Sequence, residues 1–178
     1  MFQEVCVNDA KKFYYNIFED EMEYNLKEKK LNNIEFKNKI LICGGRDYDY
    51  YEKMRILIEK INPDCIVQGG AKGADSLAKQ IAKKININCM EYSANWSMYG
   101  KKAGPIRNRK MLDDNPDVKL VIAFHGNIMN STGTKDMVNY ARKKGYKVKI
   151  VDDTPFTDTN NILDDKSIIT YENKKEKD

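Results

Sequence analysis

Three short segments of the chain combine glycine with small polar residues in a way that suits phosphate binding. They are Gly44-Gly45-Arg46-Asp47, Gly69-Gly70-Ala71-Lys72-Gly73-Ala74-Asp75 and Ser131-Thr132-Gly133-Thr134. Glycine lets a backbone approach an anion closely and can direct successive N–H groups toward it. For any single segment, a tight turn without a ligand is an equally good interpretation. Three such segments favour a phosphate-bearing ligand if the fold brings them together.

A fourth segment, residues 96–109, brings aromatic and basic side chains together. Pro105, preceded by Gly104, is expected at the first position of a helix, which would open with exposed N–H groups. Trp96 could stack on a base, although the only tryptophan of the chain could equally be a core residue.

The same helix would present Arg107, Asn108 and Arg109. Arginine holds phosphate with a bidentate pair of hydrogen bonds. One of two arginines so close together is expected to face solvent, and we favour Arg107 and Asn108 as the ligand-binding residues.

Acid–base candidates are few. Asp47, Asp75 and Asp136 could hold ribose hydroxyls or exchange a proton, but a helix cap is a strong alternative for Asp47 and Asp75. His125 stands alone, and a single histidine without a partner is more often structural. The catalytic residues, if there are any, stay unassigned.

Metal and cofactor chemistry are not indicated. The four cysteines, Cys6, Cys43, Cys65 and Cys89, lack the short paired spacing of zinc sites, so we predict reduced, buried thiols. The glycine segments match neither the dinucleotide fingerprint nor the P-loop pattern, which disfavours nicotinamide dehydrogenases and P-loop ATPases. We predict no metal and no cofactor.

The elements that must position these segments follow from the hydrophobic pattern. Short apolar runs at 40–43, 65–68, 88–92, 120–124 and 147–151 alternate with helical periodicity at 50–61, 74–84, 105–113 and 134–144, with Gly145 ending the last helix. This rhythm predicts an α/β fold with a Rossmann-like, doubly wound, mainly parallel sheet of about five strands. All the segments above would then lie at the carboxyl edge of the sheet.

We divide the chain into an N-terminal helical extension (1–38), a nucleotide-binding domain (39–152) and a polar C-terminal tail (153–178). Residues 8–30 have the pattern of an amphipathic helix, which would pack on the core or on a second subunit. We therefore expect a homo-oligomer.

The composition indicates where the protein acts and which partners it is expected to bind. With 41% hydrophobic residues, no apolar run of about 18 residues and no secretion signal, the chain is expected to be cytoplasmic and to bind no membrane. The net charge of +4 is spread among acidic residues, so it indicates nucleic acid only weakly.

The motifs ILICGGRDYDY, IVQGGAKGADSLA, NWSMYGKKAGPIRNRKML and STGTKDMVNYARKKG occur in this order. Together they resemble the YspA-like branch of the SLOG superfamily, over residues 40 to about 152. The resemblance implies a Rossmann-like fold that binds nucleotides or nucleotide-derived molecules, with the glycine motifs around Gly44, Gly69 and Gly133 lining the pocket.

The resemblance also bears on catalysis. The superfamily includes phosphoribohydrolases, relatives of the LOG enzymes, and sensors of NAD-derived signals. In the hydrolases, a catalytic glutamate follows the Gly-Thr motif, whereas the corresponding position here is Met137. Asp136 is adjacent but would project about 100° away around a helix.

We therefore expect a sensor or sequestering protein that binds a nucleotide or NAD-derived molecule. The alternative is a nucleotide N-glycosidase, in which Asp75 or Asp136 would stabilise positive charge on the sugar. Binding of single-stranded nucleic acid ranks lowest.

Overall fold

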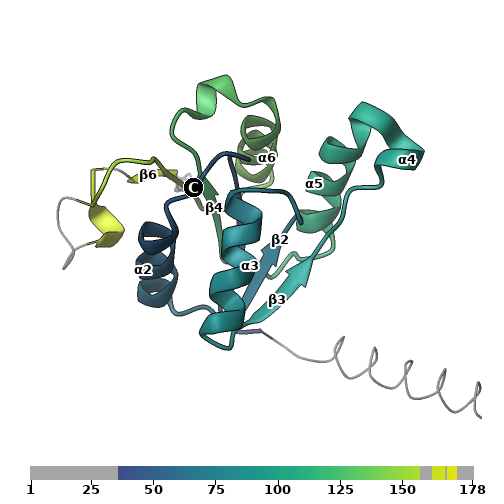
Figure 1. The fold of residues 1–178 in the computed structure, drawn as a ribbon. Coiled ribbons are helices and arrows are strands. Elements are labelled where there is room, and N and C mark those ends of the chain that lie inside the picture. The colour runs from purple at the N-terminus through teal and green to yellow at the C-terminus, as the bar shows by residue number, and fades with distance from the viewer. Residues whose placement is uncertain (1–35, 157–161, 167, 172–178) are drawn as a thin grey trace, which may run out of the picture. The chain divides into compact units, whose positions relative to one another are not determined.

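The computed structural model describes residues 36–156, 162–166 and 168–171 (Figure 1). Within them, six strands form one sheet in the order β3-β2-β1-β4-β5-β6. Strands β1 to β5 are parallel to their neighbours, and β6 is antiparallel to β5. This confirms the predicted Rossmann-like fold. The predicted helix at 8–30, and the oligomerisation assigned to it, lie outside the described residues.

The strands fall where the apolar runs place them. They are β1 (Lys39–Gly44), β2 (Cys65–Gln68), β3 (Asn88–Glu91), β4 (Leu120–Phe124), β5 (Val148–Val151) and β6 (Ile168–Tyr171). Strand β6 was not predicted, because it lies in the segment expected to be a polar tail. Ile168 of β6 is buried in one core cluster and Tyr171 packs against the other, but the two residues between them are exposed, so the strand lacks a continuous buried run.

The helices alternate with the strands as expected. They are α2 (Tyr51–Ile61), α3 (Ala74–Lys84), the short α4 (Trp96–Tyr99), α5 (Ala103–Asp113) and α6 (Thr132–Lys143), with 3-10 turns at Gly100–Lys102, Ile128–Asn130 and Ile162–Asp164. Gly145 follows α6 with a φ of 88°, a left-handed conformation that confirms its predicted role as the stop of that helix.

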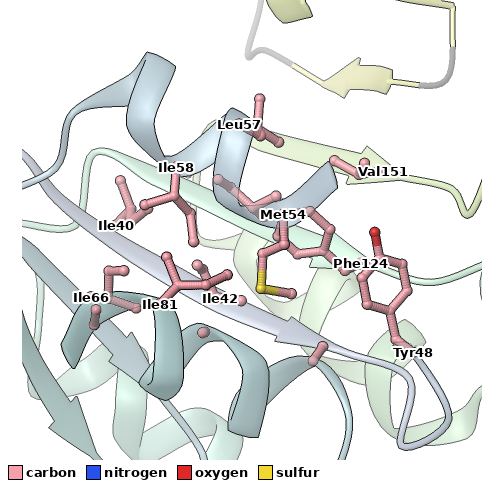
Figure 2. Packing of buried hydrophobic residues seen from close by; sticks show 14 of the residues in the cluster. Ile40, Ile42, Tyr48, Met54, Leu57, Ile58, Ile66, Ile81, Phe124 and Val151 are labelled. Atoms are coloured by element: carbon pink, nitrogen blue, oxygen red, sulfur yellow. The ribbon is translucent and has the colours of Figure 1, made fainter. Parts of the chain in front are cut away.

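Each face of the sheet has its own core, because successive strand residues point to opposite sides. Ile40, Ile42 and Phe124 face α2 and α3, where they meet Met54 and Ile81 (Figure 2). On the other face, a second cluster joins the strands to α5 and α6 through Leu41, Val67, Val121, Met111, Leu112, Met137 and Ala141. Burial on both faces makes the sheet a rigid platform for the loops at its edge.

Three further observations are limited to the described residues. Cys43 and Cys65 are buried free thiols, as predicted, and Cys89 is partly buried. No group of three potential metal ligands occurs in the described part of the chain. No helix among residues 36–156, 162–166 and 168–171 is long and apolar enough to cross a membrane.

Candidate functional site

The loops after β1 and β2 are in direct backbone contact at the carboxyl edge of the sheet. The carbonyl of Gly45 accepts a hydrogen bond from the N–H of Ala74 at 3.1 Å. A Cβ atom on Gly73, whose φ is 74°, would lie 2.2 Å from that same carbonyl oxygen. Gly44 is equally confined, since a Cβ there would lie 2.2 Å from the carbonyl oxygen of Phe124. The glycines at these positions allow the two loops to touch.

The side chains of Arg46, Asp47 and Lys72 stand exposed on these two loops. Asp47 does not cap α2, since the residue before that helix is Tyr50 and makes no side-chain cap. The three side chains are thus placed at the predicted edge, where they are accessible from solvent.

Three successive N–H groups of the loop after β2 donate to side chains of the protein itself. Those of Gly69 and Ala71 donate to one carboxylate oxygen of Asp75, each at 3.2 Å. That of Gly70 donates to the side-chain oxygen of Gln68 at 2.6 Å. This segment was predicted as a phosphate nest, but in this structure its N–H groups point inward.

Arg107 fixes the same loop from the other side. Its guanidinium donates to the carbonyl of Gly69 and lies 3.6 Å from the Asp75 carboxylate. Asp75 is only 4% exposed, and burial raises its pKa, although Arg107 and the two backbone N–H groups offset part of that effect. The Nε of Arg107 is buried without an acceptor among the described residues. The arginine therefore holds β2, α3 and α5 together.

The start of α6 is tied to α5 by a second set of polar contacts. The buried side chain of Asn108 donates to the carbonyl of Gly133 at 3.3 Å. Arg109 forms a bidentate ion pair with Asp136, at 2.8 and 2.9 Å, and lies 4.8 Å over the ring of Tyr140. The Arg109 hydrogen bonds lower the pKa of Asp136. Neither Arg107 nor Arg109 points freely into solvent.

The amino end of α6 is the open part of the edge. The hydroxyl of Ser131 caps the helix by accepting from the N–H of Thr134 at 3.1 Å. Thr132 and Gly133 are exposed, and a Cβ on Gly133 would meet no atom within 4 Å. The first N–H groups of a helix lack partners inside it. Those of Thr132 and Gly133 have no acceptor within the described part of the chain.

Met137 occupies the position where the resemblance to hydrolases suggests a glutamate. Its side chain is fully buried in the cluster that joins α6 to the sheet. It therefore serves the core and does not reach the carboxyl edge.

The aromatic segment leads into α5 without a break. Trp96 is 52% exposed, so the alternative that it is a core residue is wrong. Its ring lies 3.5 Å from the position of a Cβ on Gly104. The prediction that a helix begins with Pro105 is also wrong. The helix begins at Ala103, whose N–H is already bonded to the carbonyl of Gly100 in the preceding 3-10 turn.

His125 lies beside the loop after β1. Its Nε2 is 3.5 Å from the position of a Cβ on Gly45, and its Nδ1 accepts from the N–H of Asn127 at 3.0 Å.

Gln68 and Glu91 lie against the loop after β2 but were not among the predicted site residues. Both are polar residues at the ends of strands, which was the signal available.

The four motifs thus form one connected edge, in which Gly45 meets Ala74, Gly69 meets Arg107, and Asn108 meets Gly133. The sequence model of the YspA, cpYpsA-related SLOG family matches residues 38–99. The chain is also 34% identical over 95 residues to the Gene 61 protein of Mycobacterium phage D29. The aligned residues make up 51% of this chain and 73% of that protein. The chain belongs to the YspA, cpYpsA-related SLOG family.

Membership of the SLOG family suggests a nucleotide-related ligand. The matched residues include the glycine loops after β1 and β2 and the beginning of the aromatic segment. Because a fold carries many chemistries, the choice between binding and cleavage must come from the site.

Proposed function

We propose that this SLOG protein binds a nucleotide or an NAD-derived molecule and leaves it intact, as a sensor or sequestering protein. The phosphate would lie at the amino end of α6, over Thr132 and Gly133. In this proposal the loop after β1 contacts the sugar, and the exposed Trp96 contacts the base.

Support for the phosphate position comes from the accessible N–H groups. A helix amino end carries partial positive charge and directs N–H groups toward an anion. The N–H groups of Thr132 and Gly133 have no acceptor in the described part of the chain, and both residues are exposed, whereas the N–H groups of Gly69, Gly70 and Ala71 are occupied. The sequence predicted that three loops bind the phosphate. We propose that only one of them does, the loop that leads into α6.

One observation favours binding without hydrolysis: both nearby carboxylates are already bound by other groups of the protein. Asp136 is held by Arg109, and Asp75 by Arg107 and two backbone N–H groups. A carboxylate that stabilises a sugar cation must face that sugar. Met137 is buried in the core, so the family glutamate is missing, and neither Asp75 nor Asp136 is free to replace it.

Calorimetric titration with nucleoside monophosphates and with ADP-ribose tests the binding. Replacing Gly133 by aspartate should weaken it at least tenfold, because a carboxylate would then face the phosphate. The open space around Gly133 accommodates the side chain, and an acidic residue in the first turn stabilises a helix. Asn139→Asp adds the same charge to an exposed part of α6 and is the matched control. Equal losses in both variants would refute the phosphate position.

Turnover is tested by incubating each bound nucleotide with the protein and separating free base from intact ligand. We expect intact ligand. Release of base that disappears in an Asp75→Asn or Asp136→Asn variant that still binds would establish the N-glycosidase instead.

A further inference from the structure

One segment of the chain is exposed at every position from Asn95 to Lys102. It consists mainly of α4 and the 3-10 turn that leads into α5. Figure 1 shows α4 at an outer end of the described structure, beyond α5. A Cβ on Gly100, where α4 meets the turn, would have no atom within 4 Å. Residues 95–102, which we call the tip, therefore project into solvent.

Exposed apolar side chains are concentrated at the tip. Seven large hydrophobic side chains of the described residues are exposed. Four of the seven belong to the tip or to the first turn of α5 after it, namely Trp96, Met98, Tyr99 and Ile106. Single apolar residues are normal on a protein surface, but a group of them marks a place of contact with another molecule or with a membrane.

The charges of the tip are positive and lack acidic partners. No acidic residue occurs in the whole segment 92–112. The side chains of Lys101 and Lys102 are exposed, and neither forms an ion pair or a hydrogen bond with another described residue. The two arginines of α5, by contrast, are paired with carboxylates of the protein. The tip thus presents apolar side chains beside two free amines.

This combination suits the surface of a membrane that contains anionic lipids. Tryptophan and tyrosine favour the boundary between water and the acyl chains. Apolar side chains of a surface segment are buried at that boundary, and neighbouring lysines are attracted to anionic lipids. The expectation that the chain binds no membrane rested on the lack of a long apolar run, which a spanning helix needs and a surface contact does not.

Single-stranded nucleic acid is the nearest alternative, since it also attracts aromatic rings and cations. Proteins bind it in a positively charged groove that follows the phosphate backbone. The tip is a projection with two free lysines, and Met98, its most exposed large side chain at 69%, is not aromatic and offers no ring for a base. These features favour lipid over nucleic acid.

We propose that the tip attaches this protein to the surface of an anionic membrane, with Met98 and Tyr99 among the lipid headgroups and Lys101 and Lys102 against lipid phosphates. The inference goes beyond the proposed function, because the phosphate position at α6 is not part of the tip. Trp96, which the proposed function assigns to the base of the ligand, is used below only as a fluorescent reporter.

Sedimentation of the full chain with lipid vesicles tests the attachment. Vesicles of phosphatidylcholine with about a third of phosphatidylserine should bind the protein, and vesicles of pure phosphatidylcholine should bind it less. Trp96 is the only tryptophan of the chain, so its emission should shift to shorter wavelength as the tip leaves water. Binding to the anionic vesicles should weaken as the salt concentration rises.

A double variant measures the contribution of charge. Lys101→Ala combined with Lys102→Ala should weaken binding to the anionic vesicles about twentyfold, since each lysine near such a surface adds a favourable interaction. Lys83→Ala combined with Lys84→Ala removes two neighbouring exposed lysines from the last turn of α3 and is the matched control.

A single variant measures the apolar contribution. Met98→Ser should weaken binding to the anionic vesicles about fivefold, because a polar side chain gains nothing from leaving water. Ile169→Ser, at an exposed apolar side chain on β6, is the matched control and should bind as the unmodified protein does.

Failure of the unmodified protein to bind anionic vesicles at low salt would overturn the inference, and so would equal losses in the variants and their controls. Binding of a fluorescent oligothymidine in place of vesicles would assign the tip to nucleic acid instead. Self-association that Met98→Ser abolishes, without vesicle binding, would assign it to a second copy of the chain. The substituted side chains are all exposed, and thermal unfolding checks that each variant is folded.

Discussion

The two sides of the carboxyl edge use similar residues for different purposes. On the β2 side, Asp75, Arg107 and the loop around Gly69 bind one another, and the ion pair is largely buried. On the α6 side, Ser131 caps the helix, and Gly133 faces open space. Glycines, an acid and an arginine are the expected parts of a phosphate site, yet on the β2 side they bind one another, and only the Nε of Arg107 lacks an acceptor among the described residues. The comparison shows that residues suited to a ligand are available to one only where the protein has not already paired them.

The largest effect on stability is expected for Arg107→Ala. It would leave Asp75 buried without its cation, a change that costs about 3 to 5 kcal/mol of unfolding free energy. Urea denaturation measures it. Arg109→Ala is the matched control and should cost about 1 kcal/mol or less, because the Arg109 side chain is 42% exposed. A loss below about 1 kcal/mol for Arg107→Ala would mean that the guanidinium is free for a ligand after all.

A pair of glycine substitutions contrasts the two sides directly. Gly73→Ala should lower the unfolding free energy by about 2 kcal/mol or more, since the residue has a φ of 74° and its Cβ would strike the Gly45 carbonyl. Gly133→Ala lies in the first turn of α6 with free space around it and should raise stability by about 0.5 to 1 kcal/mol. Thermal unfolding of both variants decides the matter. The two changes in unfolding free energy should have opposite signs. If both variants lost the same amount of stability, the two sides of the edge would not differ in this respect.

The ion pair of Asp136 should make the stability of the folded protein depend on pH. The pKa of Asp136 is below its ordinary value of 3.8, chiefly through the hydrogen bonds from Arg109. A carboxylate with a lowered pKa stabilises the folded state above its unfolded pKa, and this contribution is lost as the pH falls through its folded value. Asp136→Asn should therefore be less stable than the unmodified protein at pH 7 and no less stable near pH 2. Denaturation at several pH values tests this, and a constant difference between the two proteins would argue against the ion pair.

The sequence was sufficient for the fold because burial on both faces makes the strands β1, β2 and β4 mainly apolar runs, and β5 is interrupted only by Lys149. It also placed the site residues at one edge, since parallel strands end together. It could not show which of them would pair. The bonds from Gly69 and Ala71 to Asp75 join residues close in sequence, but the contact of Arg107 with Gly69 spans 38 positions.

Glu91 was missed for a related reason. A polar residue at the end of a short, half-exposed strand resembles any surface residue. Its position over Gly70 depends on the pairing of β3 with β2 and on the hydrogen bond from Gln68. Only the assembled sheet brings these residues together.

The smallest effect on stability is expected for Trp96→Ala, which tests the open side without disturbing the paired one. Half of the Trp96 surface is already exposed, so the unfolding free energy should change by less than about 0.5 kcal/mol. If the ring stacks on the base of the ligand, affinity for a nucleotide should fall about fivefold, which corresponds to about 1 kcal/mol of stacking. Ile169→Ala, at an exposed apolar side chain on β6, is the control and should leave affinity unchanged. Loss of stability without loss of affinity would mean that the indole supports the path of the chain from α4 into α5, over Gly104, and takes no part in binding.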